Sequence, residues 1–216
     1  TFGKDYIIPK PFDPRLIAVV PPAVAKAAME SGVAKEPIED WDRYKNSLLE
    51  RLGSDNKLVR LLLGRAKTNP KRVVFAEADQ LDVLKAAQIA YEEGIAHPIL
   101  LGRKETIITL MEEIEFDADV PIIDPKSDEE LERKNHYAKA YWKKRKRQGV
   151  TIYSAEKKMR ERNYFAAMMV NVGDADALIT GYSRNYPSVV KPMLELIGMA
   201  EGVTRVATTN VMMTQR

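Results

Sequence analysis

The segment RVVFAEADQLDVLKAAQIAYEEG, residues 72–94, decides the fold class. It begins as a short apolar run rich in β-branched residues, which is typical of a buried strand. It continues as an amphipathic helical pattern that ends at Gly94. A strand joined directly to a helix of this length is the repeating unit of a parallel sheet. We therefore predict an α/β fold.

The same strand–helix alternation continues to the end of the sequence. The periodicity predicts further strands at 97–102, 120–124, 177–181 and 205–216, and helices at 104–115, 128–147, 154–162, 163–173 and 187–198. Repeated units of this kind form a mostly parallel sheet with helices on both faces. Asn163 is the expected cap of the helix at 163–173.

The first seventy residues follow a different pattern. Prolines dominate residues 1–14, and helical periodicity then runs from 15 to 31 with an expected break at Pro21-Pro22. A second helix is expected over 38–52 with Asp40 or an adjacent residue as its cap, and a third over 55–67 with Asp55 as its cap. We thus predict a tail at 1–17, a helical linker region at 18–70, and an α/β domain at 71–216 that is incomplete at its C-terminus.

Composition narrows the class of protein. Of the 216 residues, 45% are hydrophobic, which is enough for a packed core. No apolar run approaches the ~20 residues of a membrane-spanning helix, so we expect a cytoplasmic protein without membrane contact. Cysteine is absent and the two histidines lie far apart in sequence, so we expect neither a disulfide nor a metal site.

A basic run at 143–147 closes the long charged helix predicted at 128–147. Acidic residues begin that helix, so the charges at both ends match its dipole. Its buried stripe is predicted to consist of Leu131, Ala138, Tyr141 and Trp142. The alternative is a nucleic-acid patch, but no aromatic residues alternate with the basic ones, and we predict a solvated helix end without nucleic acid.

The main candidate site follows the strand at 177–181. Gly181 lets the backbone turn, and hydroxyl and amide groups then surround Arg184. Backbone amides at a helix start, combined with a guanidinium, suit a phosphate or carboxylate. A hydrophilic surface loop explains the same pattern equally well. The candidate ligand-binding residues are Gly181, Tyr182, Ser183, Arg184, Asn185, Tyr186, Ser188 and Lys191.

Two carboxylates follow the first predicted strand, where α/β sheets often bind ligands. Glu77 and Asp79 are therefore secondary candidates for the site. For Asp79 we favour a different role, as the cap of the next helix. No glycine-rich phosphate motif follows this strand, so neither a dinucleotide fold of the usual kind nor a P-loop is indicated.

Two long stretches carry a family resemblance. NYFAAMMVNVGDADALITG (163–181) and VVKPMLELIG (189–198) resemble the phosphate acetyltransferase, or phosphotransacetylase, family. Residues 72–90 are similar to the first strand and helix of that family, with Ala78 where a glycine is common. FGKDYIIPKPFDPRLI (2–17) and the stretch at 21–44 resemble bacterial hybrid NADP-dependent malic enzymes, in which a malic enzyme domain precedes a phosphotransacetylase-like domain.

The resemblance implies several properties. Residues 1–17 would be the tail of a malic enzyme domain, and 71–216 would have the phosphotransacetylase-like (isocitrate/isopropylmalate dehydrogenase-like) fold. The chain would then be a regulatory domain that senses acetyl-CoA or a related acyl ligand and supports a homo-oligomer. The parent enzyme would use NADP and a divalent metal, Mg or Mn, neither bound by this segment. An active phosphate acetyltransferase and a purely structural oligomerisation module are the alternatives.

One position departs from the family pattern. Active phosphotransacetylases carry an arginine just before the proline of this helix, and the resemblance assigns that arginine to the phosphate/acetyl site. Lys191 stands there in this chain. A lysine keeps the charge but lacks the two-pronged guanidinium, so the resemblance implies altered or absent transferase activity.

Overall fold

The computed structural model describes residues 16–50 and 56–206. The chain divides into two units, with the boundary between Leu62 and Leu63. In the first unit, α1 (Leu16–Glu30) contacts α2 (Trp41–Glu50). Asp40 accepts a hydrogen bond from the Arg43 amide at 2.9 Å, so this predicted cap is confirmed.

The predicted break at Pro21-Pro22 is wrong. Helix α1 is continuous through both prolines, and Pro22 is buried. Proline has a fixed φ that is itself helical, so the helix can continue at the cost of two backbone amide donors. The next helix, α3 (Asn56–Thr68), leads into the first strand, and its predicted cap at residue 55 lies outside the described residues.

The second unit is built on a four-stranded parallel sheet. Its strands are β1 (Lys71–Phe75), β2 (Ala96–Leu101), β3 (Ile122–Ile123) and β4 (Ala177–Ile179), in the order β3-β2-β1-β4. The predicted α/β class and the parallel sheet are confirmed. The fifth predicted strand, at 205–216, lies outside the described residues from residue 207 onward.

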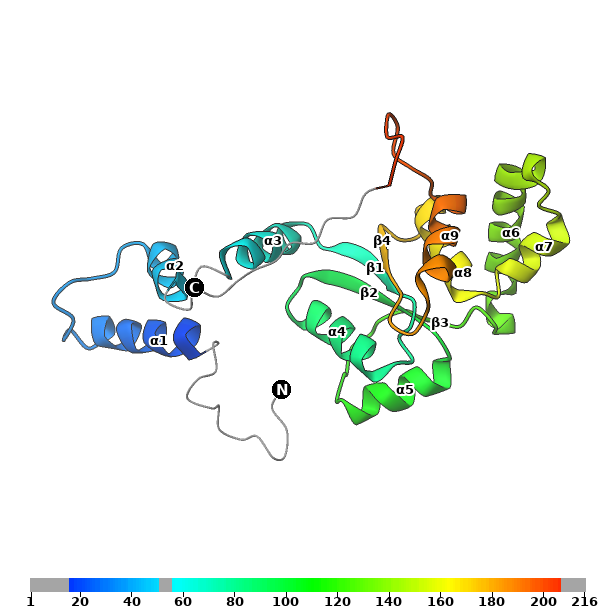
Figure 1. The fold of residues 1–216 in the computed structure, drawn as a ribbon. Helices are drawn as coiled ribbons and strands as arrows, with labels where there is room; N and C mark the ends of the chain where they lie inside the picture. Colours follow the sequence, from blue (N-terminus) through cyan, green and yellow to red (C-terminus); the bar gives the residue numbers. More distant parts are fainter. Residues whose placement is uncertain (1–15, 51–55, 207–216) are drawn as a thin grey trace. The chain divides into compact units, whose positions relative to one another are not determined.

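Helices cover both faces of this sheet (Figure 1). One face packs against α4 (Leu81–Glu92) and α5 (Lys104–Glu113). The other face packs against α6 (Leu131–Arg145), α7 (Ile152–Lys158), α8 (Arg162–Val172) and α9 (Tyr186–Leu196). Side chains alternate along β1, so Val74 joins one hydrophobic cluster and Phe75 the other.

The long charged helix is only partly as predicted. It is preceded by a 3-10 turn at Asp128–Glu130, and Ala138 and Tyr141 are buried as expected. Leu131, by contrast, is exposed at the first position of α6. Lys134 and Tyr137 are the additional buried side chains of the helix, and neither was expected in the stripe.

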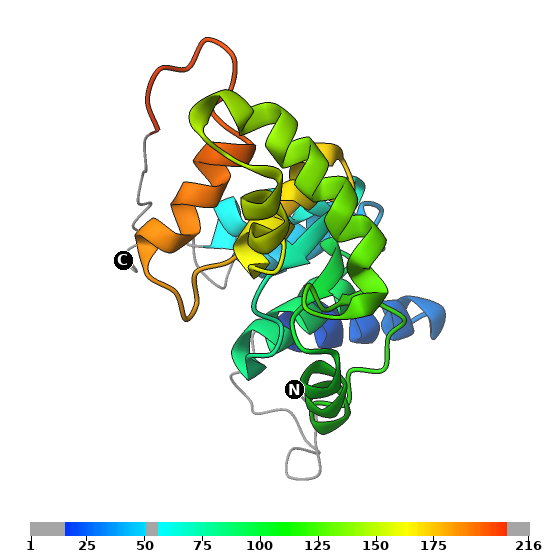
Figure 2. The same ribbon diagram turned by 90° about the vertical axis from the view of Figure 1, so that its right-hand side faces the viewer.

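The basic run caps another helix. Lys144 donates to the carbonyl of Leu196, and Arg145 donates to the carbonyls of Glu195 at 2.7 Å and Leu194 at 3.0 Å. These are the last carbonyls of α9, which lack partners within their own helix. Figure 2 shows α6 and α9 in front of the sheet, with their C-terminal ends close together. Within the described ranges, no helix is long and apolar enough to span a membrane.

The strand order shows where the chain changes the side of β1 on which it adds strands. The chain moves from β1 to β2 to β3 on one side and then returns to place β4 on the other side of β1. The carboxyl ends of β1 and β4 are therefore neighbours at a topological switch point, where open α/β sheets commonly bind ligands. Glu77 follows one of these strands, and the loop at 180–185 follows the other.

Candidate functional site

A buried carboxylate organises the switch point. Glu77 is 3% exposed, and it accepts hydrogen bonds from three successive backbone amides of the loop after β4. Those of Gly181, Tyr182 and Ser183 lie 2.8, 2.9 and 2.9 Å from its oxygens, and the Ser183 hydroxyl also donates to it. Gly181 has a φ of 104°, a conformation open mainly to glycine, which makes this turn possible.

These bonds keep Glu77 ionised. Burial alone would raise its pKa, but the Ser183 hydroxyl and the three backbone amides together hold the pKa of Glu77 below its ordinary value. The loop amides that we predicted to bind a phosphate or carboxylate ligand thus donate to a carboxylate of the chain itself. Any anion bound here has to be held by other groups.

The second carboxylate after β1 is paired with an arginine. Both carboxylate oxygens of Asp79 accept from the guanidinium of Arg162, one of them at 2.7 Å, and the Asp79 side chain is 5% exposed. The N-cap of α4 is Gln80, without a side-chain capping bond. The prediction that Asp79 caps this helix is therefore wrong, because its carboxylate is paired with Arg162 at the start of α8.

The turn before α8 also differs from expectation. The N-cap of α8 is Glu161, not Asn163. Asn163 instead accepts a hydrogen bond from Thr180 Oγ1 at 2.8 Å and donates to the Ser188 carbonyl at 3.3 Å. The side chain of Asn163 thus joins the start of α8 to both ends of the loop after β4 and is not available for capping.

A basic hollow of about 350 Å³ lies between these elements. We call it the switch-point hollow; it is lined by Glu77, Lys126, Arg160, Glu161, Arg162, Asn163, Arg184 and Ser188. The carboxylate of Glu77 is already saturated by the loop. Among the described residues, no ion pair involves Lys126, Arg160 or Arg184. Their positive charges suit a phosphate or carboxylate ligand.

The predicted site residues take different places. Arg184 and Ser188 line the switch-point hollow together with Glu77. Gly181, Tyr182 and Ser183 bind Glu77 through their amides, and the Tyr182 hydroxyl donates to Asp82. Asn185 caps α9 by accepting from the Ser188 amide. Tyr186 is exposed at the start of that helix.

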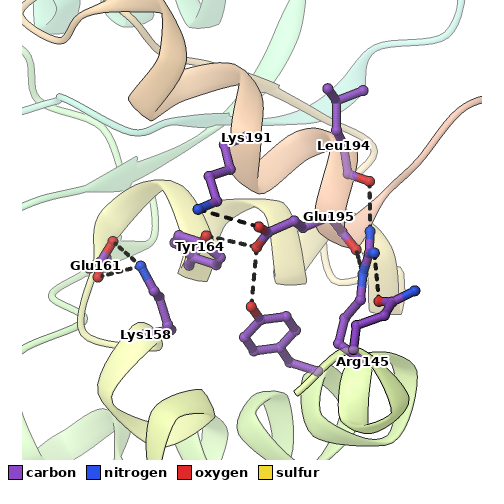
Figure 3. A network of polar contacts seen from close by, with 9 residues as sticks. Arg145, Lys158, Glu161, Tyr164, Lys191, Leu194 and Glu195 are labelled. Atoms are coloured by element: carbon purple, nitrogen blue, oxygen red, sulfur yellow. Dashed lines mark hydrogen bonds and ion pairs between the residues drawn. The ribbon is translucent and has the colours of Figure 1, made fainter. Parts of the chain in front are cut away.

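Lys191 does not line the hollow. Its ammonium lies 3.8 Å from Glu195 Oε1, one turn further along α9, and 69% of its side chain is exposed. Figure 3 shows Lys191 directed toward Glu195, which also accepts from Tyr164. A second tyrosine, Tyr141, donates to the same carboxylate at 3.1 Å. Burial and the adjoining carboxylate raise the pKa of Tyr141 to about 12 and also raise the pKa of Tyr164, so both hydroxyls remain protonated donors.

Sequence reasoning missed Lys126, Arg160, Arg162 and Asn163 as lining residues. One signal was present in the sequence. Arg160 and Arg162 stand just before the predicted helix at 163–173, and the strand that follows this helix, β4, pairs with β1 and ends at the same edge of the sheet. Their charge resembles that of any surface turn, and only the fold brings them to the end of β1.

The fold and this hollow define an α/β protein with a basic site at the switch point of a parallel sheet. The chain belongs to the phosphate acetyl/butaryl transferase family, whose model matches residues 57–216. The predicted resemblance to phosphotransacetylases is thereby confirmed. A solved structure, EutD phosphotransacetylase from Staphylococcus aureus, is similar with a TM-score of 0.61 and 25% identity, over 71% of this chain and 46% of that one.

Malic enzymes match the chain over nearly its whole length. The NADP-dependent malic enzyme of Escherichia coli strain K12 is 38% identical over 218 residues, and the NAD-dependent malic enzyme of Rhizobium meliloti is 38% identical over 221 residues. These alignments cover 99% and 100% of the chain and 28% of each malic enzyme. The chain thus spans little more than a quarter of these relatives, and the predicted resemblance to malic enzymes is also confirmed.

Proposed function

We propose that this chain is a regulatory module that binds acetyl-CoA or a related anionic acyl ligand. The observation that carries the proposal is the switch-point hollow, in which Lys126, Arg160 and Arg184 have no ion-pair partner among the described residues. Three cations that form no ion pair within the described part of the chain, at the carboxyl end of a parallel sheet, favour a phosphate-bearing or carboxylate-bearing ligand.

The geometry favours binding over group transfer. Acyl transfer needs preorganised donors that are free to stabilise developing negative charge. Here the three loop amides and the Ser183 hydroxyl already donate to Glu77. Lys191, at the position of the family's arginine, is paired with Glu195. The loop donors and Lys191 are therefore engaged elsewhere.

The parent of this module is proposed to be a malic enzyme, which oxidises and decarboxylates malate to pyruvate with NADP and Mg or Mn. The similarity to malic enzymes over 99% of this chain supports this assignment. The described residues hold no group of three or more potential metal ligands, so the metal would be bound by the malic enzyme domain of the same polypeptide. Ligand binding would act on that domain through contacts in a homo-oligomer, with a coupling of about 1–3 kcal/mol.

The test measures malate-dependent NADPH production by the complete natural protein, titrated with acetyl-CoA. We expect a saturable change in rate, and we expect Arg184→Ala to raise the half-saturating concentration about ten-fold, because a charged hydrogen bond is lost. Arg147→Ala is the matched control, since Arg147 is exposed and does not line the switch-point hollow. An acetyl-CoA response that is absent, or that Arg184→Ala leaves unchanged, contradicts the proposal.

A working phosphate acetyltransferase is the second candidate, and the family match over residues 57–216 favours it. In that reaction the CoA thiolate attacks the carbonyl of acetyl phosphate and releases phosphate. Formation of acetyl-CoA from acetyl phosphate and CoA by the same preparation would establish it. We expect no such activity, because the loop donors are bound to Glu77.

A further inference from the structure

A buried lysine in α6 has no ion-pair partner among the described residues. Lys134 is 5% exposed, and its ammonium donates to the Ser127 carbonyl at 2.7 Å. Within residues 16–50 and 56–206, this is its one side-chain hydrogen bond, and no ion pair involves it. An ammonium group has three N–H donors, and a buried charge is costly unless it is paired. The group therefore has unused capacity to bind an anion.

This lysine lines a hollow of about 380 Å³ between α6 and α7. We call it the α6–α7 hollow. Lys157 and Arg160 line it as well, and its one acidic lining residue among those described is Glu156. Three cations against one carboxylate leave the hollow with a net positive charge. Exposed Leu131 and Tyr153 add apolar and aromatic surface to its wall.

We propose that the α6–α7 hollow binds a phosphorylated small molecule, whose phosphate contacts Lys134, Lys157 and Arg160. Its volume lies within the usual range for small-molecule sites, roughly 300–1,000 Å³. The apolar or aromatic part of the ligand packs against Leu131 and Tyr153, which offer a face for stacking.

Arg160 gives this site its relation to the first one. Its side chain lines both the α6–α7 hollow and the switch-point hollow. No residue of the loop after β4 lines the α6–α7 hollow, so the two sites are distinct apart from this arginine. In a ligand with two phosphate groups, both groups can contact the guanidinium of Arg160. We therefore expect pyrophosphate to bind more tightly than inorganic phosphate.

The experiment is a calorimetric titration of the complete natural protein with inorganic phosphate and with pyrophosphate. Lys134→Met keeps the apolar stem and removes the charge, and Lys157→Gln removes an exposed cation from the same wall. We expect each variant to weaken pyrophosphate binding about ten-fold, as for the loss of one charged hydrogen bond. Lys139→Met, an exposed lysine of α6 outside the hollow, is the control and should bind normally.

Thermal unfolding provides an independent readout. Phosphate stabilises any folded protein to some extent as a salt, and a bound phosphate adds to this effect. We therefore expect phosphate to raise the Tm of the wild type and of Lys139→Met more than that of Lys134→Met. Without phosphate, we expect Lys134→Met to be at least as stable as the wild type, because a buried unpaired charge is removed. Should Lys134→Met fail to fold, Lys157→Gln carries the binding test alone.

Arg184→Ala distinguishes the two sites, because Arg184 lines the switch-point hollow and does not line the α6–α7 hollow. Phosphate binding that survives in Arg184→Ala and weakens in Lys157→Gln supports the α6–α7 site, whatever the fate of the acetyl-CoA response. The proposal is overturned if the wild type binds neither anion at millimolar concentration. It is also overturned if Lys134→Met and Lys157→Gln bind as Lys139→Met does.

Discussion

The loop after β4 and the turn before α8 both border the switch-point hollow, but they use their polar groups in opposite ways. In the loop, the amides of residues 181–183 and the Ser183 hydroxyl are consumed by Glu77. In the turn, Arg160 has no ion-pair partner among the described residues and lines both hollows. A binding site is therefore defined by the donors that remain unpaired after folding, and a polar-rich sequence does not reveal which those are.

The largest expected effect comes from removing the carboxylate that orders the loop. Glu77→Ala leaves three backbone amides near the end of β1 without their acceptor. Unsatisfied donors of this kind cost about 1–3 kcal/mol each when buried, and partial hydration should limit the total to about 3 kcal/mol. Urea unfolding of the variant and the wild type measures the difference. A loss of less than about 0.5 kcal/mol, the usual scale of surface changes, would show that the loop does not depend on Glu77.

The same carboxylate predicts a pH dependence. The pKa of Glu77 in the folded state lies below its ordinary value of 4.5, so its stabilising contribution is complete above that pH and is lost as the pH falls through the folded-state pKa. Glu77→Gln cannot titrate, and we expect the stability gap between wild type and Glu77→Gln to narrow on acidification from pH 6. A gap that stays constant down to pH 3 would contradict this assignment.

The next effect in size concerns the pair that holds Arg162. Asp79→Ala leaves the three-quarters-buried guanidinium without its carboxylate, and we expect a loss of about 2 kcal/mol. The double variant with Arg162→Ala should lose less than the sum of the single variants, which a double-mutant cycle in urea would measure. Because Asp79→Ala frees a cation that lines the switch-point hollow, phosphate affinity should rise in that variant. Additive losses would show that the pair contributes no coupling.

The sequence predicted the elements of the sheet domain well because their signals are local. The alternation in residues 72–94 alone indicates β1, α4 and the glycine that follows them. Long-range pairing was not predictable in this way. Glu77 and Ser183 are more than a hundred residues apart, and Asp79 carries the same local signal whether it caps α4 or pairs with Arg162. The strand order resolves both cases, since it places β4 beside β1.

The smallest expected effect separates Lys191 from the site. Lys191→Met removes an exposed partner of Glu195, and such i,i+4 pairs contribute only about 0.3–0.5 kcal/mol. Glu195 keeps the hydroxyl donors of Tyr141 and Tyr164, so its carboxylate is not left unsatisfied. The acetyl-CoA response should therefore resemble that of the wild type, whereas Arg184→Ala weakens it. If Lys191→Met weakened the response as strongly as Arg184→Ala, Lys191 would leave Glu195 on ligand binding, and the positive charge on α9 would belong to the switch-point hollow after all.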